Sequence, residues 1–270
     1  MRAEIFFIVM KLELLAFGVH PDDVELSCAG ALLVEKNNGK KTGIIDLTAG
    51  ELGTRGTGEI RKAEAAVAAK ILGVEIRENL GMADGFFQNN EDHQRKIITA
   101  LRTFQPEIIL CNAPEDRHPD HGRSSRLVSD AAFLSGLKKI ETSRNGITQE
   151  AWRPKYVFRY IQDRMLSPDF VIDITNVFEQ KIEAIKAYKT QFHTQYPADN
   201  GDTGEPETYI SSPDFLDSVV YRHKWFGFGF CKFWIPFLQP FSINPAIKQP
   251  HGSWIIAFIN FIQRFNFFFR

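Results

Sequence analysis

The sequence is poor in several features that define common protein classes, and each shortage excludes one of them. Three cysteines in 270 residues, far apart and without a C-x-x-C pair, exclude a disulfide scaffold and predict buried, reduced thiols. No apolar run reaches the roughly 20 residues that a membrane-spanning helix needs. With 32 basic and 33 acidic residues, the chain lacks the broad basic face of a nucleic-acid binder. We therefore expect a cytoplasmic protein that binds a small molecule, with neither a nucleic acid nor a membrane as its partner.

A phosphate-binding loop is also missing. Gly50, Gly53, Gly56 and Gly58 lie between a predicted strand and a predicted helix, but their spacing is not G-x-G-x-x-G and no Gly-Lys-Ser/Thr sequence follows them. We therefore expect no nucleotide at this loop.

What the sequence does contain is a regular alternation of strand-like and helix-like segments. Alternation of this kind predicts an α/β fold with a mostly parallel sheet and helices on both of its faces. Ligands of such sheets bind beyond the carboxyl ends of the strands. The predicted strands are 12–19, 43–47, 76–80, 107–111, 155–161 and 169–174, and the predicted helices are 24–38, 59–72, 92–104, 123–137, about 175–188 and about 213–225.

The predicted domain covers residues 10–225. Residues 1–9 precede Met10 and are expected to be an over-extended start or a disordered leader. Residues 226–270 differ sharply in composition, because they hold half of the 24 phenylalanines and no acidic residue. Three interpretations of this tail stay open: a contact surface for an oligomer or a membrane, a swapped packing element, or a segment outside the evolved fold, such as the product of a shifted reading frame.

Two short motifs carry the chemistry, His-Pro-Asp-Asp at 20–23 and His-Pro-Asp-His at 118–121. A single motif of this kind is consistent with an ordinary turn, because Pro and Asp favour turns and Asp often begins a helix. Each motif, however, follows a predicted strand, so both fall on the edge of the sheet where ligands bind. The pair therefore predicts an enzyme site.

The residue types in these motifs are those of a hydrolytic metal centre. His20 and Asp23 lie close enough in sequence to bind one cation from the same turn, and His121 completes the set. Such nitrogen and oxygen ligands suit one Zn²⁺ ion per chain, and three protein ligands leave a position open. Asp22, next to a ligand, is the candidate general base for the attacking water.

Further roles are predicted around this centre. His118 is expected to stabilise the oxyanion or to protonate the leaving amine, and Asp120 to hold the His118 ring in the required tautomer. Glu51 and Arg55 in the glycine-rich loop, together with Arg117, are predicted to contact the substrate, with the forked guanidinium groups suited to a carboxylate. The remaining histidines are isolated in the sequence and are expected to be surface or core residues: His93, His193, His223 and His251.

These motifs resemble those of the PIG-L (LmbE-like) family of zinc-dependent N-acetylglucosamine deacetylases. The segments 46–51 (Asp-Leu-Thr-Ala-Gly-Glu), 115–118 (Glu-Asp-Arg-His) and 167–170 (Ser-Pro-Asp-Phe) are similar to the bacillithiol branch, which deacetylates N-acetylglucosaminyl malate. The resemblance covers about residues 10–225 and implies a Rossmann-like fold. It also implies zinc ligation by His20, Asp23 and His121, with Asp22 as base and His118 assisted by Asp120. The tail departs from that branch, so what the family tail contributes to assembly, including a homo-oligomer, stays open.

The sequence thus predicts a zinc hydrolase that releases acetate from an N-acetylglucosaminide, with the malate conjugate as the expected substrate. One alternative is a deacetylase of the same family with another N-acetyl sugar conjugate as substrate, since loops read the rest of the substrate. The other is a non-catalytic sugar- or nucleotide-binding module, which would need neither Asp22 nor the second pair of histidines.

Overall fold

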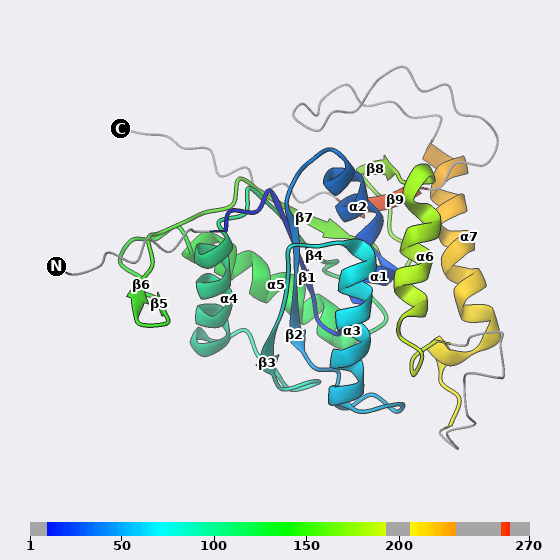
Figure 1. Ribbon diagram of the computed structural model, residues 1–270, viewed down its shortest axis with the longest axis horizontal. Helices are drawn as coiled ribbons and strands as arrows, with labels where there is room; N and C mark the ends of the chain where they lie inside the picture. Colours follow the sequence, from blue (N-terminus) through cyan, green and yellow to red (C-terminus); the bar gives the residue numbers. More distant parts are fainter. Residues whose placement is uncertain (1–9, 193–205, 231–254, 260–270) are drawn as a thin grey trace.

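The computed structural model describes residues 10–192, 206–230 and 255–259. Within these residues the strand order of the main sheet is β3-β2-β1-β4-β7-β9-β8, and β5 and β6 form a separate hairpin (Figure 1). Strands β3, β2, β1, β4 and β7 run parallel, whereas β9 is antiparallel to both of its neighbours. The strands are β1 (Leu14–Gly18), β2 (Thr42–Thr48), β3 (Ile76–Met82), β4 (Ile108–Asn112), β5 (Ser143–Arg144), β6 (Ile147–Thr148), β7 (Tyr156–Tyr160), β8 (Phe170–Asp173) and β9 (Ile255–Ile259).

Helices cover both faces of the sheet, as the alternation predicts. Helices α4 and α5 pack on one face, and α3, α6 and α7 lie on the other (Figure 1). The fold class predicted from the sequence is therefore confirmed. The helices are α1 (Asp23–Leu26), α2 (Ala29–Asn37), α3 (Gly58–Leu72), α4 (Glu91–Phe104), α5 (Pro119–Leu134), α6 (Phe178–Lys186) and α7 (Pro213–Phe230), with 3₁₀ turns η1 (Thr175–Val177) and η2 (Tyr209–Ser211).

The central strand β1 shows how the sequence builds two cores. Successive side chains of a strand point to opposite faces, so Leu14 and Ala16 enter the core beneath α2, α3 and α6, while Leu15 and Phe17 enter the core beneath α4 and α5. All four side chains are buried. Burying a large apolar side chain contributes roughly 1.5–3 kcal/mol, so a strand that is apolar on both sides fixes the sheet between its helices.

Capping residues explain where several helices begin and end. Thr57 accepts a hydrogen bond from the Ile60 amide at the start of α3, and Gly73 ends that helix in the left-handed conformation. Asn90 caps α4 in the same manner as Thr57 caps α3. These residues fix the lengths of the helices and hence the positions of the loops that connect them to the strands.

The structure corrects three of the predicted helix boundaries. The helix expected at 24–38 divides into α1 and α2, because the backbone leaves the helical region at Ser27. The helix expected from 123 begins at Pro119, since proline favours the first position of a helix. The last helix, expected to end near 225, continues to Phe230. Strand β9 pairs with β7 and β8, so residues after the predicted boundary at 226 also take part in the main sheet. The division of the chain into domains stays a prediction.

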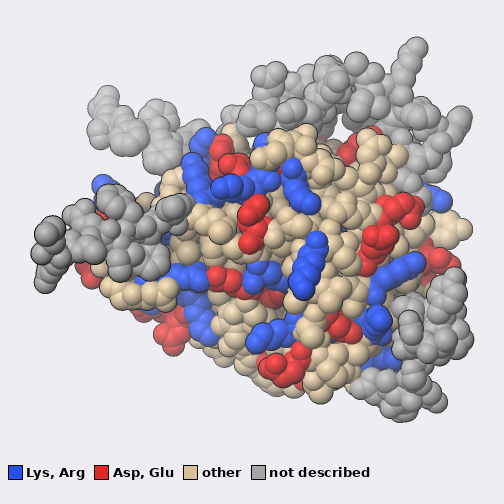
Figure 2. Space-filling view, in the orientation of Figure 1, with Lys and Arg blue, Asp and Glu red and all other residues tan. Residues whose placement is uncertain are grey.

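The surface carries both signs of charge. Figure 2 shows basic and acidic side chains interspersed over one face, in keeping with the balanced composition. Among the described residues, the helices are too short or too polar for any of them to cross a bilayer. Cys28 and Cys111 are buried, and burial raises the pKa of their thiols to about 12 and about 11, so both are unreactive core residues.

Candidate metal centre

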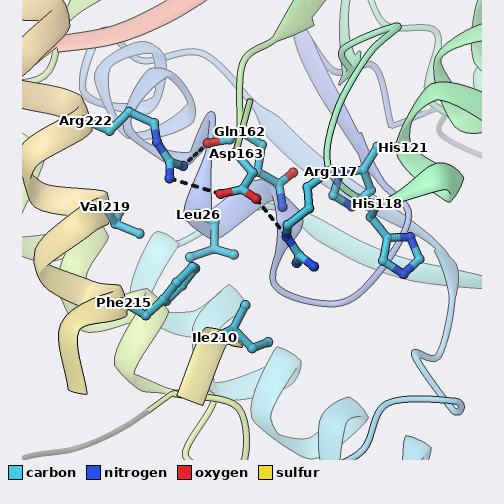
Figure 3. Close-up of a pocket in the computed structure, with 10 residues that line it drawn as sticks. All are labelled: Leu26, Arg117, His118, His121, Gln162, Asp163, Ile210, Phe215, Val219 and Arg222. Carbon is cyan, nitrogen blue, oxygen red and sulfur yellow. Dashed lines mark hydrogen bonds and ion pairs between the residues drawn. The ribbon is translucent and has the colours of Figure 1, made fainter. Parts of the chain in front are cut away.

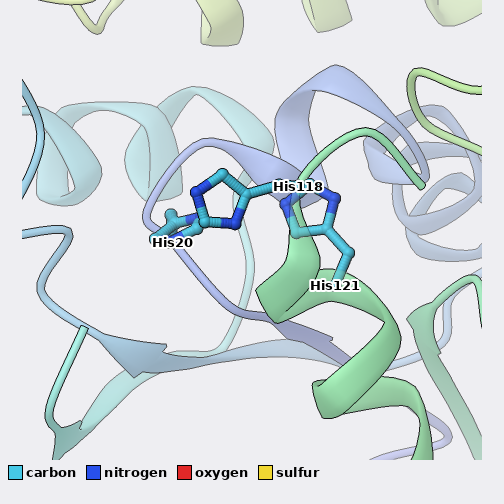
Figure 4. A group of neighbouring side chains, drawn as sticks. All are labelled: His20, His118 and His121. Carbon is cyan, nitrogen blue, oxygen red and sulfur yellow. The ribbon is translucent and has the colours of Figure 1, made fainter. Parts of the chain in front are cut away.

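The two motifs meet at the carboxyl ends of neighbouring strands. The 20–23 turn follows β1, the 118–121 motif follows β4, and these strands pair in parallel. Their three histidines come together, with ring centroids 4.8 Å apart for His20 and His118, 5.4 Å for His118 and His121, and 5.8 Å for His20 and His121 (Figure 4). The sequence prediction that both motifs form a single site is thus consistent with their positions.

Asp23 lies between two of these rings. The Nδ1 atom of His20 is 3.8 Å from its Oδ2 atom, and the Nε2 atom of His121 is 3.2 Å from its Oδ1 atom. Asp23 and His121 are buried, and His20 is mostly so. The structure therefore brings together the three ligands predicted from the sequence.

The outward nitrogen of each ring is held by a carboxylate. The Nε2 atom of His20 is 3.0 Å from Asp84 Oδ1, and the Nδ1 atom of His121 is 2.6 Å from Asp116 Oδ2. Carboxylates in this position are typical of histidines that bind zinc, because they fix the tautomer and aim the other nitrogen at the metal. This donor set fits Zn²⁺.

The charges at the site favour a cation. Burial lowers the pKa of His121, but Asp23 and Asp116 outweigh this effect and raise it to about 10. Burial would raise the pKa of Asp23, yet His121, His20 and a hydrogen bond from Gln162 hold it well below its usual range. Positive charge at this point is therefore stabilised by buried carboxylates, which is the environment that a dication requires.

Asp23 is itself fixed by backbone and side-chain donors. Its Oδ2 atom accepts hydrogen bonds from the amides of Val19 (2.9 Å) and His20 (3.1 Å), and Oδ1 accepts one from Gln162 Nε2 (2.7 Å). Gly18 packs closely against this turn, because a Cβ atom there would lie 3.2 Å from Asp23 Cβ. The turn and Gln162 thus hold this carboxylate in one position.

Other ligand combinations are also close together. One donor atom from each of His20, His118 and His121 forms a group within 4.8 Å, and so does one from each of His20, Asp84 and Asp120. In the second group, Asp84 bonds to the Nε2 atom of His20, and this hydrogen bond orients the His20 ring. The position of Asp23 between the two facing nitrogens favours the set of His20, Asp23 and His121, which stays a prediction.

Asp22 is buried beside this set in an uncommon backbone conformation. Its φ angle is 135°, a region that few residues other than glycine adopt, and its side chain is only 6% exposed. Burial raises the pKa of Asp22 to about 7, against the opposing effect of Arg61, whose Nη2 atom lies 4.0 Å from Oδ2. A carboxylate that titrates near neutrality matches the requirement of a general base, although a bound dication would lower this value.

His118 is half-buried and begins helix α5. Its Nδ1 atom accepts a hydrogen bond from the Asp120 amide (3.3 Å), so in the neutral ring Nε2 carries the proton. Burial lowers the pKa of His118, as do His20 and His121. The carboxylate of Asp120 instead accepts hydrogen bonds from the Gly85 amide (2.9 Å) and Arg123 (2.7 Å). In the structure, His118 therefore bonds to the backbone amide of Asp120, whereas the prediction assigned this bond to the Asp120 carboxylate.

Two of the three predicted substrate contacts lie on the wall of a larger cavity of about 310 Å³, which the three histidines also line. Arg55 and Arg117 both line it, and Arg117 lies over the Tyr209 ring at 4.8 Å from its centre. Glu51 accepts hydrogen bonds from the amides of Asp84 (2.9 Å) and Ala49 (3.2 Å). Its side chain therefore bonds to the loop backbone that supports Asp84.

A second, smaller cavity adjoins the larger one, and we call it the side pocket (Figure 3). Its polar lining includes Asp163, which accepts hydrogen bonds from Arg117 Nε (2.7 Å) and Arg222 Nη2 (3.1 Å). The ten lining residues are Leu26, Arg117, His118, His121, Gln162, Asp163, Ile210, Phe215, Val219 and Arg222.

Sequence reasoning missed several residues of the site. Asp84 follows β3, Gln162 follows β7 and Asp116 precedes the second motif, so each lies at the same sheet edge as the predicted ligands. Their places after predicted strands or beside a motif are the sequence signal that could have drawn attention to them. Arg61 lies within α3, and its position beside Asp22 follows only from the packing of α3 against the first turn.

Two of the isolated histidines have structural roles. His93 is partly exposed, and its Nδ1 atom is 2.9 Å from Gln88 O. His223 is buried, with Nδ1 2.6 Å from Val219 O, and burial holds its pKa well below the usual range. The expectation of surface and core positions is confirmed for these two, while His193 and His251 lie outside the described residues.

Several known proteins are similar to this chain. Residues 15–132 match the family described as PIG-L: GlcNAc-PI de-N-acetylase. The conserved protein TT1542 of Thermus thermophilus has 30% sequence identity and a TM-score of 0.72, over 92% of this chain and 94% of that one. A diacetylchitobiose deacetylase of Thermococcus kodakarensis is 26% identical over 72% of this chain and 74% of the relative. A probable N-acetyl-alpha-D-glucosaminyl L-malate deacetylase 2 of Bacillus subtilis is 25% identical over 67% and 84%. With both motifs inside the matched region, this chain belongs to the PIG-L family.

Proposed function

We propose that the protein is a zinc-dependent hydrolase that removes acetate from an N-acetylglucosaminide in the cytoplasm. The observation that carries the proposal is the convergence of His20, Asp23 and His121 on one point, with Asp22 and His118 beside it. A binding module needs neither a buried carboxylate base nor a second histidine at this point. Membership of the PIG-L family supports the same reaction.

One Zn²⁺ ion would be held by His20 Nδ1, Asp23 and His121 Nε2. Zinc at such a site supplies polarisation of the acetamide carbonyl and acidification of water. The chain itself supplies the orientation of these ligands through Asp84 and Asp116, which bond to the outward ring nitrogens.

Two residues handle the protons. Asp22 Oδ accepts the proton of the attacking water, and its strained, buried position keeps it from turning into solvent. His118 has its Nε2–H available for the developing oxyanion or for the leaving amine, because its Nδ1 atom already accepts a backbone hydrogen bond. Donors fixed before the reaction need no reorganisation while charge develops.

The substrate that we favour is N-acetylglucosaminyl malate. Arg55 and Arg117 on the wall of the larger cavity provide cationic groups for a dicarboxylate, and the sequence segments at 46–51, 115–118 and 167–170 resemble the bacillithiol branch. The malate deacetylase relative points in the same direction. The competing substrate class is an N-acetyl sugar conjugate without carboxylates, such as the substrate named for the diacetylchitobiose relative.

Release of free acetate tests the proposal. The zinc-loaded protein would be incubated with N-acetylglucosaminyl malate, an N-acetylglucosaminyl inositol, diacetylchitobiose and free N-acetylglucosamine. We expect the malate conjugate to react fastest and the Asp22→Asn protein, loaded with the same metal, to be nearly inactive. If another conjugate reacts fastest, the substrate assignment moves to that class. If no substrate yields acetate while binding of the sugars is measurable, the protein is a binding module.

A further inference from the structure

The side pocket differs from the larger cavity in size and in chemistry. Its volume is about 20 Å³, and a single water-sized sphere fills roughly 10–15 Å³ by this measure. The pocket therefore has room for one group about the size of a methyl. The larger cavity, at about 310 Å³, has room for a sugar.

The side pocket adjoins the metal centre. It shares six lining residues with the larger cavity, His118 and His121 among them, so the two cavities lie against each other beside the predicted ligands. Beyond the histidines the walls are apolar, formed by Leu26 from α1, Ile210 from η2, and Phe215 and Val219 from α7 (Figure 3). An acetamide has a polar oxygen, a polar nitrogen and one apolar methyl, and only the methyl suits these walls.

Charged side chains that pair with one another form the polar wall of the side pocket (Figure 3). Asp163 accepts hydrogen bonds from Arg117 and Arg222, and Arg222 also donates to the Gln162 carbonyl oxygen. The side pocket has no free volume for a longer acyl chain unless these paired side chains or the apolar wall move, and close-packed walls resist such movement.

We propose that the side pocket binds the acyl methyl and limits the enzyme to acetyl and similarly short acyl groups, with Ile210 and Val219 determining this specificity. This inference rests on the proposed amide hydrolysis and adds the residues that select the acyl group. The selectivity comes from overpacking, since one additional methylene in a pocket that is already full must displace the wall.

Acyl chain length provides the test. N-acetyl, N-propionyl and N-butyryl versions of the most reactive glucosaminyl conjugate would be compared by measuring the free amine that all three release. We expect kcat/KM to fall at least about tenfold from acetyl to propionyl and further for butyryl. This is the range over which one additional methylene changes kcat/KM in a hydrophobic pocket.

Enlarged pockets sharpen the test. Val219→Ala and, as a second variant at a half-buried position, Ile210→Ala should each raise the propionyl-to-acetyl ratio of kcat/KM by about tenfold, the range expected for one methylene. Val220→Ala is the matched control, because it makes the same change at the next residue of α7, which does not line the side pocket. That control should leave the ratio at the wild-type value.

The outcomes separate this inference from the function on which it rests. Equal rates for all three acyl groups, or ratios in Val219→Ala and Ile210→Ala that match Val220→Ala, would overturn the acyl pocket and leave amide hydrolysis standing. Absence of amine release from every acyl conjugate would overturn both. A ratio that rises in the two pocket variants and not in the control supports the inference.

Discussion

The metal centre and the outer wall of the cavity are built in opposite ways. The predicted ligands come from two turns that follow adjacent parallel strands, and the base and His118 lie in the same turns. The outer wall comes from segments far along the chain: Asp163 after β7, Tyr209 and Ile210 in η2, and the first turns of α7. The first region is fixed by the sheet, whereas the second depends on how α7 packs against it.

Because of this difference, we expect the metal centre to determine whether the reaction occurs and the outer wall to determine which substrates react. The positions of the residues in the first region depend on strand pairing and on the two motifs. A wall formed by a distant helix can change in shape without moving a ligand, because the hydrogen bonds that orient Asp23 come from Val19, His20 and Gln162 and not from Ile210 or Val219. We therefore expect substitutions in the first region to abolish the reaction and those in the second to change its preferences.

The largest effect is expected at His121. His121→Ala removes one of three predicted ligands, so purified protein should contain far less zinc than wild type by metal analysis and should lose nearly all activity. His93→Ala, at a partly exposed surface position, is the matched control and should retain zinc. Full zinc occupancy in His121→Ala would remove this residue from the ligand set.

Asp22→Asn should separate catalysis from metal binding. Asparagine tolerates a positive φ angle better than most residues, so the turn should persist and zinc content should stay close to wild type. Loss of the general base should lower kcat on the order of 10²–10⁴-fold. Near-normal turnover by the zinc-loaded variant would show that another group accepts the proton.

A smaller loss is expected at His118. His118→Ala removes a donor from the transition state, and comparable donors contribute on the order of 10²–10³-fold to kcat. Steady-state kinetics should therefore show a fall in kcat with little change in KM. A change confined to KM would assign the residue to substrate binding and move it to the second region of the comparison.

The smallest effects are expected at the cavity wall. Arg55→Ala and Arg117→Ala should each lower kcat/KM for N-acetylglucosaminyl malate by about tenfold or more, since a charge-assisted hydrogen bond contributes roughly 1.5–3 kcal/mol, and should change the rate on free N-acetylglucosamine much less. Arg126→Ala, on the exposed side of α5, is the control. A preference for malate that survives both substitutions would place the carboxylate contact elsewhere.

Periodicity and motif spacing predicted the sheet, its helices and the meeting of the two motifs, because each of these depends on neighbouring residues and on the rule that parallel strands end at one edge. They could not predict Arg61 beside Asp22 or Val219 in the wall of the side pocket, since those positions depend on the exact packing of α3 and α7. The role of Asp120 stays a prediction. A sequence shows that Asp120 lies near His118, but not that its carboxylate turns toward Gly85 and Arg123.

The hydrogen bonds of Lys181 can form only late in the synthesis of the chain. Its Nζ atom is buried and donates hydrogen bonds to the carbonyl oxygens of Glu25 (2.9 Å) and Ser27 (2.7 Å), next to the four-residue helix α1 that carries Asp23. A helix this short has little stability of its own. The contact joins residues 156 positions apart, so during synthesis the first motif leaves the ribosome long before the lysine that supports it. A nascent chain that has emerged only as far as α5 therefore holds all the predicted ligands without the support that fixes their turn.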